Sequence, residues 1–559
     1  MPQKQNKYAV ISSLPKKYRI RSKMLDEKIN KIHTLLNSRY HKIRVSDLIV
    51  YFMVLIYFVV FSLFTVARHY TFKTNAFDLG IENQALYTTL FNGKFFYETP
   101  DAYYTLSGSF FGLHFTPITF ILLPIYYIYP HPETLLIFQS AVLALAAIPL
   151  YFLARTLMKG NNVIPVGLAA AYLMNPFIHT ANAYDFHIEC LLPLFSLMAL
   201  YSLESKKWKG FVVFSILSAV IIDFAAIITF FIGIYGILKN WNPFIRLIKG
   251  KEVLAEEYDI LIGSFLIVAT SVLLLFLAVV TISYFGPPPL SSVWIEVFPK
   301  LGKNYADILR NIVMEPGRII SAISFDGIYK LIYLTSLFLP TFFLAFYSPK
   351  ELILCFPWVA ISALTSVNTL YQPNYHFGAF IVPFILYATT HSLAKLQPKN
   401  LGRLDLFKRI RTPLTTTILV MIAVSPLSPI PHASSDSAAY AGLPIPTHHT
   451  DLLQKAVILI PDNASVFAQN HIFAHFANRV DVFVSLPFGV IVDYAIADRT
   501  QHDYKTPHAF RETFQQQFEW LLNGGDYDVV VGVGDEFEKE GIMVLKRHTI
   551  QAANLSSMP

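Results

Sequence analysis

A single aspartate, Asp78, stands in a polar motif that directly follows the first long apolar run of the chain. The motif reads Asn-Ala-Phe-Asp-Leu-Gly over residues 75–80. A charged side chain at a membrane boundary is costly unless it is solvated, paired or used in function. Asp78 could therefore act as a base or bind a cation at the membrane surface. It could also cap the N-terminus of the amphipathic segment that follows, and a capping aspartate is also held in one position.

A second acidic motif combines three residues that can bind a cation or a phosphate group. Asp185, His187 and Glu189 alternate just before a later apolar run. In an extended segment all three side chains point to one face, whereas in a helix only Asp185 and Glu189 share a face. The two carboxylates converge in either case, and they could hold a divalent cation such as magnesium or manganese, or bind a phosphate through one. The alternative is a solvated loop in which the aspartate caps a helix.

Four more polar side chains within or beside apolar segments have a functional and a structural explanation. His114 opens a short apolar stretch, where it is either part of a site or an ordinary hydrogen-bonded residue. Asp223 interrupts a strongly apolar run, so it marks the turn of a helical hairpin or a carboxylate that faces a cavity. Tyr375 and His376 follow another apolar run and are typical of the aromatic belt at a membrane surface, with substrate binding as the alternative.

The composition of the chain is that of a polytopic membrane protein. Of its 559 residues, 54% are hydrophobic and 14% are charged, whereas soluble domains contain about 25% charged residues. Mean hydropathy is +0.47, and the apolar runs reach the roughly 20 residues that span a bilayer. The net charge of +7 comes largely from lysines and arginines that crowd residues 4–44. This arm follows the positive-inside rule, which we favour over nucleic-acid binding.

The distribution of positive charge predicts the side of the membrane on which each segment lies. Residues 1–47 form a basic cytoplasmic arm, and residues 48–428 form a transmembrane helical module of about eleven spans. The first external loop, residues 68–132, contains Asp78, and a second external loop covers residues 283–325. Both acidic motifs are therefore expected at the outer face of the plasma membrane, where they can form one site.

Two apolar segments do not have the length of one ordinary span. Residues 114–129 contain two prolines and are predicted to form a juxtamembrane or re-entrant segment. Residues 211–238 have basic residues on both flanks, which predicts two short helices with Asp223 at an external turn. The last predicted span covers residues 414–424.

Residues 429–559 differ in kind and predict an external α/β domain. A linker rich in proline and serine precedes short β-branched runs that alternate with helical patterns. We expect strands at residues 457–460, 482–484, 529–531 and 543–545, and a helix at residues 507–522. Walker A, GxGxxG, GxSxG and HExxH motifs are absent from the sequence. Glycosylation sequons at Asn463 and Asn554 lie on the predicted outer side.

Four segments taken together resemble the prokaryotic membrane-protein family catalogued as domain of unknown function 2079. These are residues 76–81, 109–117, 184–189 and 460–466. The resemblance runs from about residue 48 to the C-terminus, and the family is similar to the C-type glycosyltransferases, multi-span enzymes that use lipid-phosphate sugars. In that pattern an aspartate occupies the first external loop and a second acidic motif occupies the next. The sequence departs from the sharper paired-acid signature of many such enzymes, because Leu79 and Gly80 follow the aspartate.

The resemblance implies an inverting enzyme that takes a monosaccharide from a polyprenyl-phosphate donor and transfers it to a surface acceptor. Asp78 would be the general base, and Asp185, His187 and Glu189 would bind a divalent cation or orient the donor phosphate. His114 would contact the leaving phosphate, and the C-terminal domain would cover the site or receive the acceptor. Two other functions remain open: a transporter or flippase for a lipid-linked or anionic solute, and a non-catalytic envelope assembly protein.

Overall fold

The computed structural model describes residues 44–101, 105, 107–158, 160–286, 297–396, 415, 419, 425–428, 442–500 and 513–548. Several sequence predictions fall outside these residues: nearly all of the basic arm, most of the last predicted span, the start of the helix predicted from residue 507 and the sequon at Asn554. The chain divides into two compact units, residues 1–51 and residues 52–559. All the residues of the site described below belong to the second unit.

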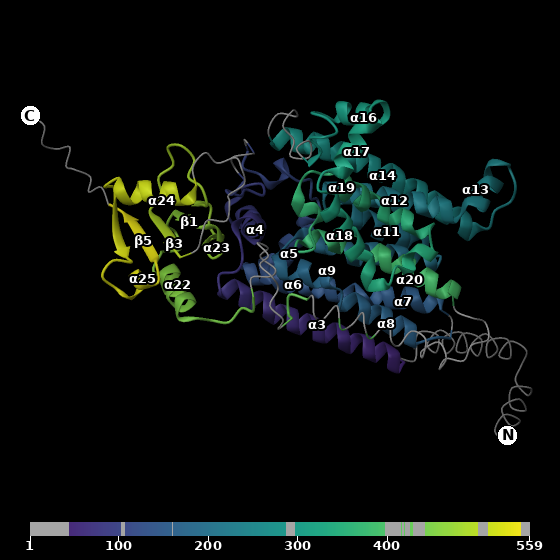
Figure 1. Cartoon of the computed structure of the whole chain (residues 1–559), viewed down its shortest axis with the longest axis horizontal. Coiled ribbons are helices and arrows are strands. Elements are labelled where there is room, and N and C mark those ends of the chain that lie inside the picture. Colours follow the sequence, from purple (N-terminus) through teal and green to yellow (C-terminus); the bar gives the residue numbers. More distant parts are fainter. Residues whose placement is uncertain are drawn as a thin grey trace, which may run out of the picture. The chain divides into compact units, whose positions relative to one another are not determined.

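Five helical segments among the described residues are long and apolar enough to cross a membrane. They are α3 (Val45–Tyr70), α6 with α7 (Pro132–Leu145 and Ala147–Leu157), α8 with α9 (Val163–Leu173 and Pro176–Tyr184), α14 (Ala255–Phe285), and the segment His376–Leu396, which contains α20 (Val382–Leu396) (Figure 1). Two pairs of helices would each qualify as one broken span. The first pair is α12 (Asp223–Lys239) and α13 (Trp241–Ile248), with an angle of 71° between them. The second pair is α17 (Pro316–Ser324) and the segment Gly327–Thr341, which begins with α18 (Gly327–Phe338), with an angle of 76° between them. The described part of the protein therefore has five to seven candidate spans.

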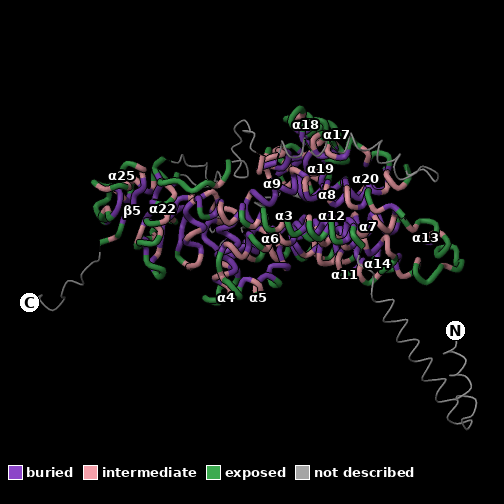
Figure 2. Tube along the Cα trace, turned by 90° about the horizontal axis from the view of Figure 1, so that it is seen from below, coloured by how far each residue is buried: buried purple, intermediate pink, exposed green. Residues whose placement is uncertain are grey.

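The candidate spans carry apolar side chains on their exposed faces. On α14, for example, Phe276 is 63% exposed and Leu273 is 55% exposed. Figure 2 shows exposed residues, in green, on α13, where Trp241 and Ile248 are among them. Contiguous exposed apolar surface of this kind is expected for helices that are surrounded by lipid.

Shorter helices explain why the sequence-based count of spans was higher, at about eleven. The apolar runs after the second acidic motif form α10 (Leu191–Glu204) and α11 (Trp208–Ala219), of 14 and 12 residues. A helix of 12 residues extends about 18 Å, which is less than the roughly 30 Å of a hydrocarbon core. Two expectations are confirmed: Asp223 begins a new helix after the end of α11, and residues 114–129 contain only the short helix α5 (Thr119–Ile128). The other short helices are α16 (Tyr305–Met314) and α19 (Phe356–Leu364).

The helix α4 (Ile81–Asn92) is largely buried although its first turn is polar. It continues directly from a π-helical turn, Ala76–Gly80, and ends at Gly93, whose φ of 65° suits a left-handed cap. Glu82, Asn83 and Gln84 are all buried in its first turn. A polar helix is buried only where both of its sides find hydrogen-bonding partners, and α4 finds them in the candidate site on one side and in the C-terminal domain on the other.

The C-terminal domain is built on a five-stranded mixed sheet, which confirms the predicted α/β class. Its strands are β1 (Val466–Ala468), β2 (Val482–Phe483), β3 (Tyr494–Asp498), β4 (Tyr527–Val531) and β5 (Ile542–Arg547), in the order β2-β1-β3-β5-β4. The first three strands pair in parallel and the last two pair antiparallel. The helices of the domain are α22 (His448–Ile458), α23 (Asn470–Phe473), α24 (Phe514–Asn523) and α25 (Glu536–Lys539).

One predicted strand of this domain is wrong. Residues 457–460 form the end of α22 and the turn after it. Thr447 starts this helix with a capping box that it shares with Thr450. Leu452, Ala456 and Ile460 then follow at a spacing of four residues and enter the apolar core of the sheet. The capping signal and the helical spacing outweigh the β-branched residues at the end of the segment.

Candidate functional site

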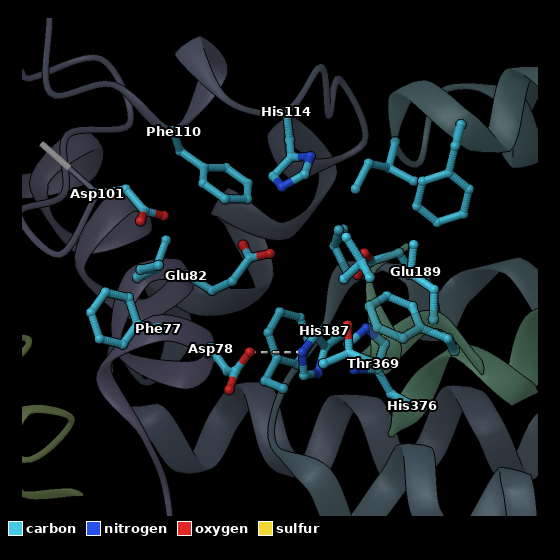
Figure 3. A pocket seen from close by; sticks show the side chains of 18 of the residues that line it. Phe77, Asp78, Glu82, Asp101, Phe110, His114, His187, Glu189, Thr369 and His376 are labelled. Carbon is cyan, nitrogen blue, oxygen red and sulfur yellow. Dashed lines mark hydrogen bonds and ion pairs between the residues drawn. The ribbon is translucent and has the colours of Figure 1, made fainter. Parts of the chain in front are cut away.

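A cavity of about 300 Å³ lies between the first loop, the segment after α9 and the start of the segment His376–Leu396. Among the described residues, its wall contains four carboxylic acids and three histidines: Asp78, Glu82, Asp101, Glu189, His114, His187 and His376 (Figure 3). Apolar side chains such as Phe77 and Phe110 separate these polar groups. Charges inside such a partly apolar wall interact more strongly than they would in water.

The π-helical turn and α4 place two of the carboxylates side by side. Asp78 lies within the turn, and Glu82 lies in the first turn of α4, four residues later. Both side chains line the cavity, and Figure 3 shows the Glu82 carboxylate between Asp78 and His114. Sequence reasoning missed Glu82, although its spacing of i, i+4 from Asp78 was a signal that both would share one helix face. It also missed Asp101, for which no local pattern gives a signal.

Asp78 forms an ion pair with His187 across the cavity. The distance from Asp78 Oδ1 to His187 Nε2 is 3.0 Å, and the His187 ring stacks on the ring of His376 with centroids 3.6 Å apart. The backbone N–H of His187 donates to Gln139 Oε1 at 2.9 Å, which fixes the segment against α6. Burial would lower the pKa of His187, but the nearby Asp78 carboxylate outweighs it and raises that pKa to about 9. His187 is therefore cationic at neutral pH.

A second histidine–aspartate pair forms another part of the site. His114 Nδ1 lies 3.5 Å from Asp223 Oδ2, and Asp223 is held at the N-terminus of α12. Burial opposes the charged form of His114, but the contact with Asp223 raises its pKa overall. His114 and Asp223 were each identified from the sequence, but their pairing was not. They are 109 positions apart, which is too far for a local pattern to indicate a contact. His114 lines the cavity, whereas Asp223 is not part of the described cavity wall and contacts the His114 ring.

Asp185 does not join the cavity with Glu189, contrary to the expected convergence of the two carboxylates. Asp185 directly follows α9, whereas Glu189 lies in a 3₁₀ turn, Ile188–Cys190, so neither one helix nor one extended strand contains both. The Asp185 Oδ2 atom accepts hydrogen bonds from the backbone N–H and the side-chain amide of Asn75, at 2.9 and 3.1 Å. Burial raises the pKa of Asp185 to about 8, with a further contribution from the Asp78 carboxylate.

Tyr375 and His376 have different positions relative to the site. His376 lines the cavity and stacks on His187, as described above. Tyr375 is not among the described residues of the cavity wall, and its ring lies 5.4 Å from that of Tyr184. Of Tyr375 and His376, only His376 is therefore at the cavity surface.

Two further carboxylic acids of the cavity bind protons unusually tightly. Burial, reinforced by the neighbouring Glu189, raises the pKa of Glu82 to about 8. Burial likewise raises the pKa of Asp101 to about 7, although His114 opposes the shift. At neutral pH the cavity therefore combines the Asp78–His187 ion pair with acids that exchange protons near neutrality.

Replacing Glu82 by glutamine is expected to raise the melting temperature above pH 8 and to change it little at pH 5. The folded protein binds the Glu82 proton more tightly than the unfolded chain does, because the pKa rises from 4.5 to about 8 on folding. This contribution to stability is complete below pH 4.5 and is lost as the pH rises through about 8. Glutamine has no proton to lose, so the variant escapes that loss.

Thermal unfolding between pH 5 and pH 9 tests this expectation. Glu256→Gln is a matched control, because Glu256 is 64% exposed and pairs with Lys206 on the surface. The expectation fails when the melting temperature of Glu82→Gln falls between pH 5 and pH 8 as steeply as that of the unmodified protein.

No group of three or more histidine, cysteine, aspartate or glutamate side chains among the described residues is arranged to hold a metal ion. Of the two predicted metal ligands, Glu189 lies at the cavity and Asp185 faces Asn75. The cationic His187, the neighbouring His114 and the Asp78 carboxylate can instead bind an anionic group and accept a proton from a hydroxyl group.

Comparison with known proteins agrees with the membrane character of the chain. The family model described as "Predicted membrane protein (DUF2079)" matches residues 68–518, a range that includes both acidic motifs and the strands β1, β2 and β3 of the C-terminal sheet. A search of the curated proteins finds no match. Since the family model covers well over half of the chain, the protein belongs to the DUF2079 family of predicted membrane proteins.

Proposed function

We propose that the protein is an integral-membrane glycosyltransferase that moves a monosaccharide from a polyprenyl-phosphate donor to a cell-surface acceptor. One observation carries this proposal. A single cavity, in a chain with several candidate spans, combines the Asp78 carboxylate with two histidines, His187 and His114, whose pKa values are raised by neighbouring acids. A base beside a cationic histidine suits the attack of a hydroxyl group on a sugar that leaves from a phosphate.

In the proposed reaction Asp78 removes the proton from the acceptor hydroxyl group. The acceptor oxygen forms a bond with the anomeric carbon, and the bond between that carbon and the phosphate oxygen breaks. Polyprenyl phosphate leaves with the bonding electron pair, the imidazolium group of His187 stabilises its charge, and His114 contacts it. A direct displacement of this kind inverts the configuration at the anomeric carbon.

The size of the cavity fits the head group of such a donor. Small-molecule sites commonly occupy about 300–1,000 Å³, and this cavity of about 300 Å³ is at the lower end of that range. A sugar phosphate can enter it, but a polyprenyl chain cannot. We place the lipid chain along the exposed apolar faces of the candidate spans, with the first loop and the C-terminal domain at the outer face and the N-terminus in the cytoplasm.

We also propose that Glu189 and Glu82, rather than Asp185, hold a divalent cation that arrives with the donor. Their carboxylates share the cavity wall, which fits the preference of magnesium and manganese for oxygen ligands. Magnesium is commonly bound by one or two carboxylates plus substrate phosphates, so a set of three protein ligands is not required. When bound, the cation would neutralise charge on the leaving phosphate.

The test uses the full chain reconstituted in lipid nanodiscs with radiolabelled polyprenyl-phosphate hexoses. We expect release of free polyprenyl phosphate together with transfer of the sugar to an acceptor, and release slowed by about 10²- to 10⁴-fold in the Asp78→Asn variant. A transporter would instead move the intact donor across a proteoliposome membrane without cleaving it. Such flux, in the absence of any bond cleavage across a panel of donors and acceptors, would overturn the proposal.

A further inference from the structure

One side chain of the C-terminal domain reaches the first acidic motif directly. The Asn470 Oδ1 atom, at the start of α23, accepts a hydrogen bond from the backbone N–H of Ala76 at 2.9 Å. The Asn470 side-chain amide donates to Asn75 Oδ1 at 3.2 Å. These bonds fix the chain two and three residues before Asp78.

Asn75 extends this contact to the second acidic motif. Its backbone N–H and its side-chain amide both donate to Asp185 Oδ2, as described above. Asp185 is 2% exposed, and its backbone oxygen in turn accepts a bond from Gln139 at 2.5 Å. Gln139 also accepts the backbone N–H of His187, which is the partner of Asp78. The path Asn470–Asn75–Asp185–Gln139–His187 therefore links the C-terminal domain to both halves of the Asp78–His187 pair.

Close packing holds α23 against the same turn. A Cβ atom at Gly80 would lie 2.7 Å from Phe473 Cδ1, so only glycine leaves room for the Phe473 ring. Phe72 and Ala76, which flank the start of the motif, belong to the apolar core that covers one face of the C-terminal sheet. The turn that carries Asp78 is thus packed into the domain as part of its core.

The opposite face of α4 adds hydrogen bonds that do not involve the acidic motifs. Asn83 Nδ2 donates to Asn478 Oδ1 at 2.7 Å, and the Gln84 side-chain amide donates to the carbonyls of Arg479 and Val480. Asn478 also donates to the carbonyl of Pro130 at 2.7 Å. These contacts dock the domain at a distance from the Asp185 path, and they supply a control.

We propose that Asn470 is a positioning residue of the site, through which the C-terminal domain fixes the Asp78 turn and the Asp185 segment relative to each other. This inference deepens the proposed function and rests on it for its catalytic consequence. The domain is then a working part of the transferase, and loss of the Asn470 contacts loosens both acidic motifs. A domain that merely covered the cavity would not need to bond to either motif.

The experiment compares Asn470→Ala with Asn478→Ala in the full chain in nanodiscs, by hydrogen–deuterium exchange of peptides covering residues 74–80 and 184–188. Both variants remove an asparagine that bonds to the membrane module, so they match in kind. We expect at least tenfold faster exchange in both peptides for Asn470→Ala, and unchanged exchange at residues 184–188 for Asn478→Ala. Equal effects of the two variants, or no change in Asn470→Ala, would overturn the proposal.

A second variant keeps the test decisive where Asn470→Ala loosens the whole domain. Asn470→Asp retains the oxygen that accepts the Ala76 N–H and removes the amide that donates to Asn75, with almost no change in volume. We expect it to speed exchange at residues 184–188 with the domain still folded, as judged by exchange in β1 and β3. Normal exchange at residues 184–188 in this variant contradicts the path through Asn75.

Turnover supplies the readout that depends on the proposed function. Misplaced catalytic groups lower kcat more than they raise KM, so Asn470→Ala should lose about 10- to 100-fold in kcat with less than a threefold change in KM. If no donor is cleaved by the unmodified protein, the proposed function fails. The exchange experiment still decides whether Asn470 positions the two motifs.

Discussion

Replacing Asp78 by asparagine is expected to lower the rate of sugar transfer by about 10²- to 10⁴-fold, the usual contribution of a general base. Asparagine has nearly the same shape and can still accept a hydrogen bond from His187 Nε2, which lies 3.0 Å away. Asparagine cannot take up the proton that the hydroxyl group of the sugar acceptor must lose. The variant should therefore fold, bind the donor and fail in chemistry.

The choice of pH separates the loss of the base from an indirect effect on His187. The Asp78 carboxylate raises the pKa of His187 to about 9, so the variant lowers this pKa toward its ordinary value of 6.5. Donor affinity should then weaken at pH 8 and recover as the pH is lowered, whereas turnover should stay low at every pH. Recovery of turnover at low pH would show that Asp78 acts only through the charge of His187.

Asp528→Asn is a matched control for this experiment. Asp528 also pairs with a histidine, His548, at 2.9 Å, but both side chains lie on the surface of the C-terminal domain. The control should leave turnover and donor affinity unchanged. An equal loss in both variants would indicate a general response to removing an aspartate and would contradict the role of Asp78.

The second large effect is expected at His187, where glutamine should weaken donor binding by about 10- to 100-fold. A glutamine amide can donate to Asp78 but carries no charge, and a hydrogen bond to a charged group contributes about 1.5–3 kcal/mol. Tenfold in affinity corresponds to about 1.4 kcal/mol. The weaker binding should appear mainly as a higher dissociation constant for the donor, measured at pH 7 with a donor that cannot be turned over.

The pH dependence of binding identifies His187 as the source of this energy. A sugar phosphodiester keeps one negative charge between pH 6 and pH 10, so changes in affinity report on the protein. His187 is cationic below its pKa of about 9 and loses its charge above it. Donor affinity of the unmodified protein should therefore fall as the pH rises through about 9. His187→Gln should keep only the fall near pH 7–8, where Asp101 and Glu82 lose their protons. His548→Gln serves as the surface control, and a fall near pH 9 that persists in His187→Gln would assign that charge to another group.

Asp78 and His187 could be predicted from the sequence because both stand in polar motifs at the edges of apolar runs. Buried polar groups in a membrane protein need a reason, so these residues were visible without any structure. The direction of Asp185 could not be predicted in this way. Its path is set by Asn75, a residue 110 positions earlier, and by the break in the backbone between α9 and the turn that contains Glu189.

The C-terminal domain shows the same division between local and long-range information. The strands at residues 482–484, 529–531 and 543–545 were found because β-branched runs are a local signal. The parallel strands β1 and β3 were missed, since the pairing between them joins segments that are distant in sequence. The contact of Asn470 with the Asp78 turn could not be predicted from the residues of either acidic motif.

The distance along the chain between Asn75 and Asn470 also bears on the synthesis of the protein. The two residues are 395 positions apart, so the ribosome finishes the Asp78 turn long before it makes the side chain that holds it. A nascent chain that has inserted its first helices still lacks α23 and the sheet behind it. The turn that carries Asp78 therefore gains its hydrogen bonds to Asn470 only after the C-terminal domain has been made and folded.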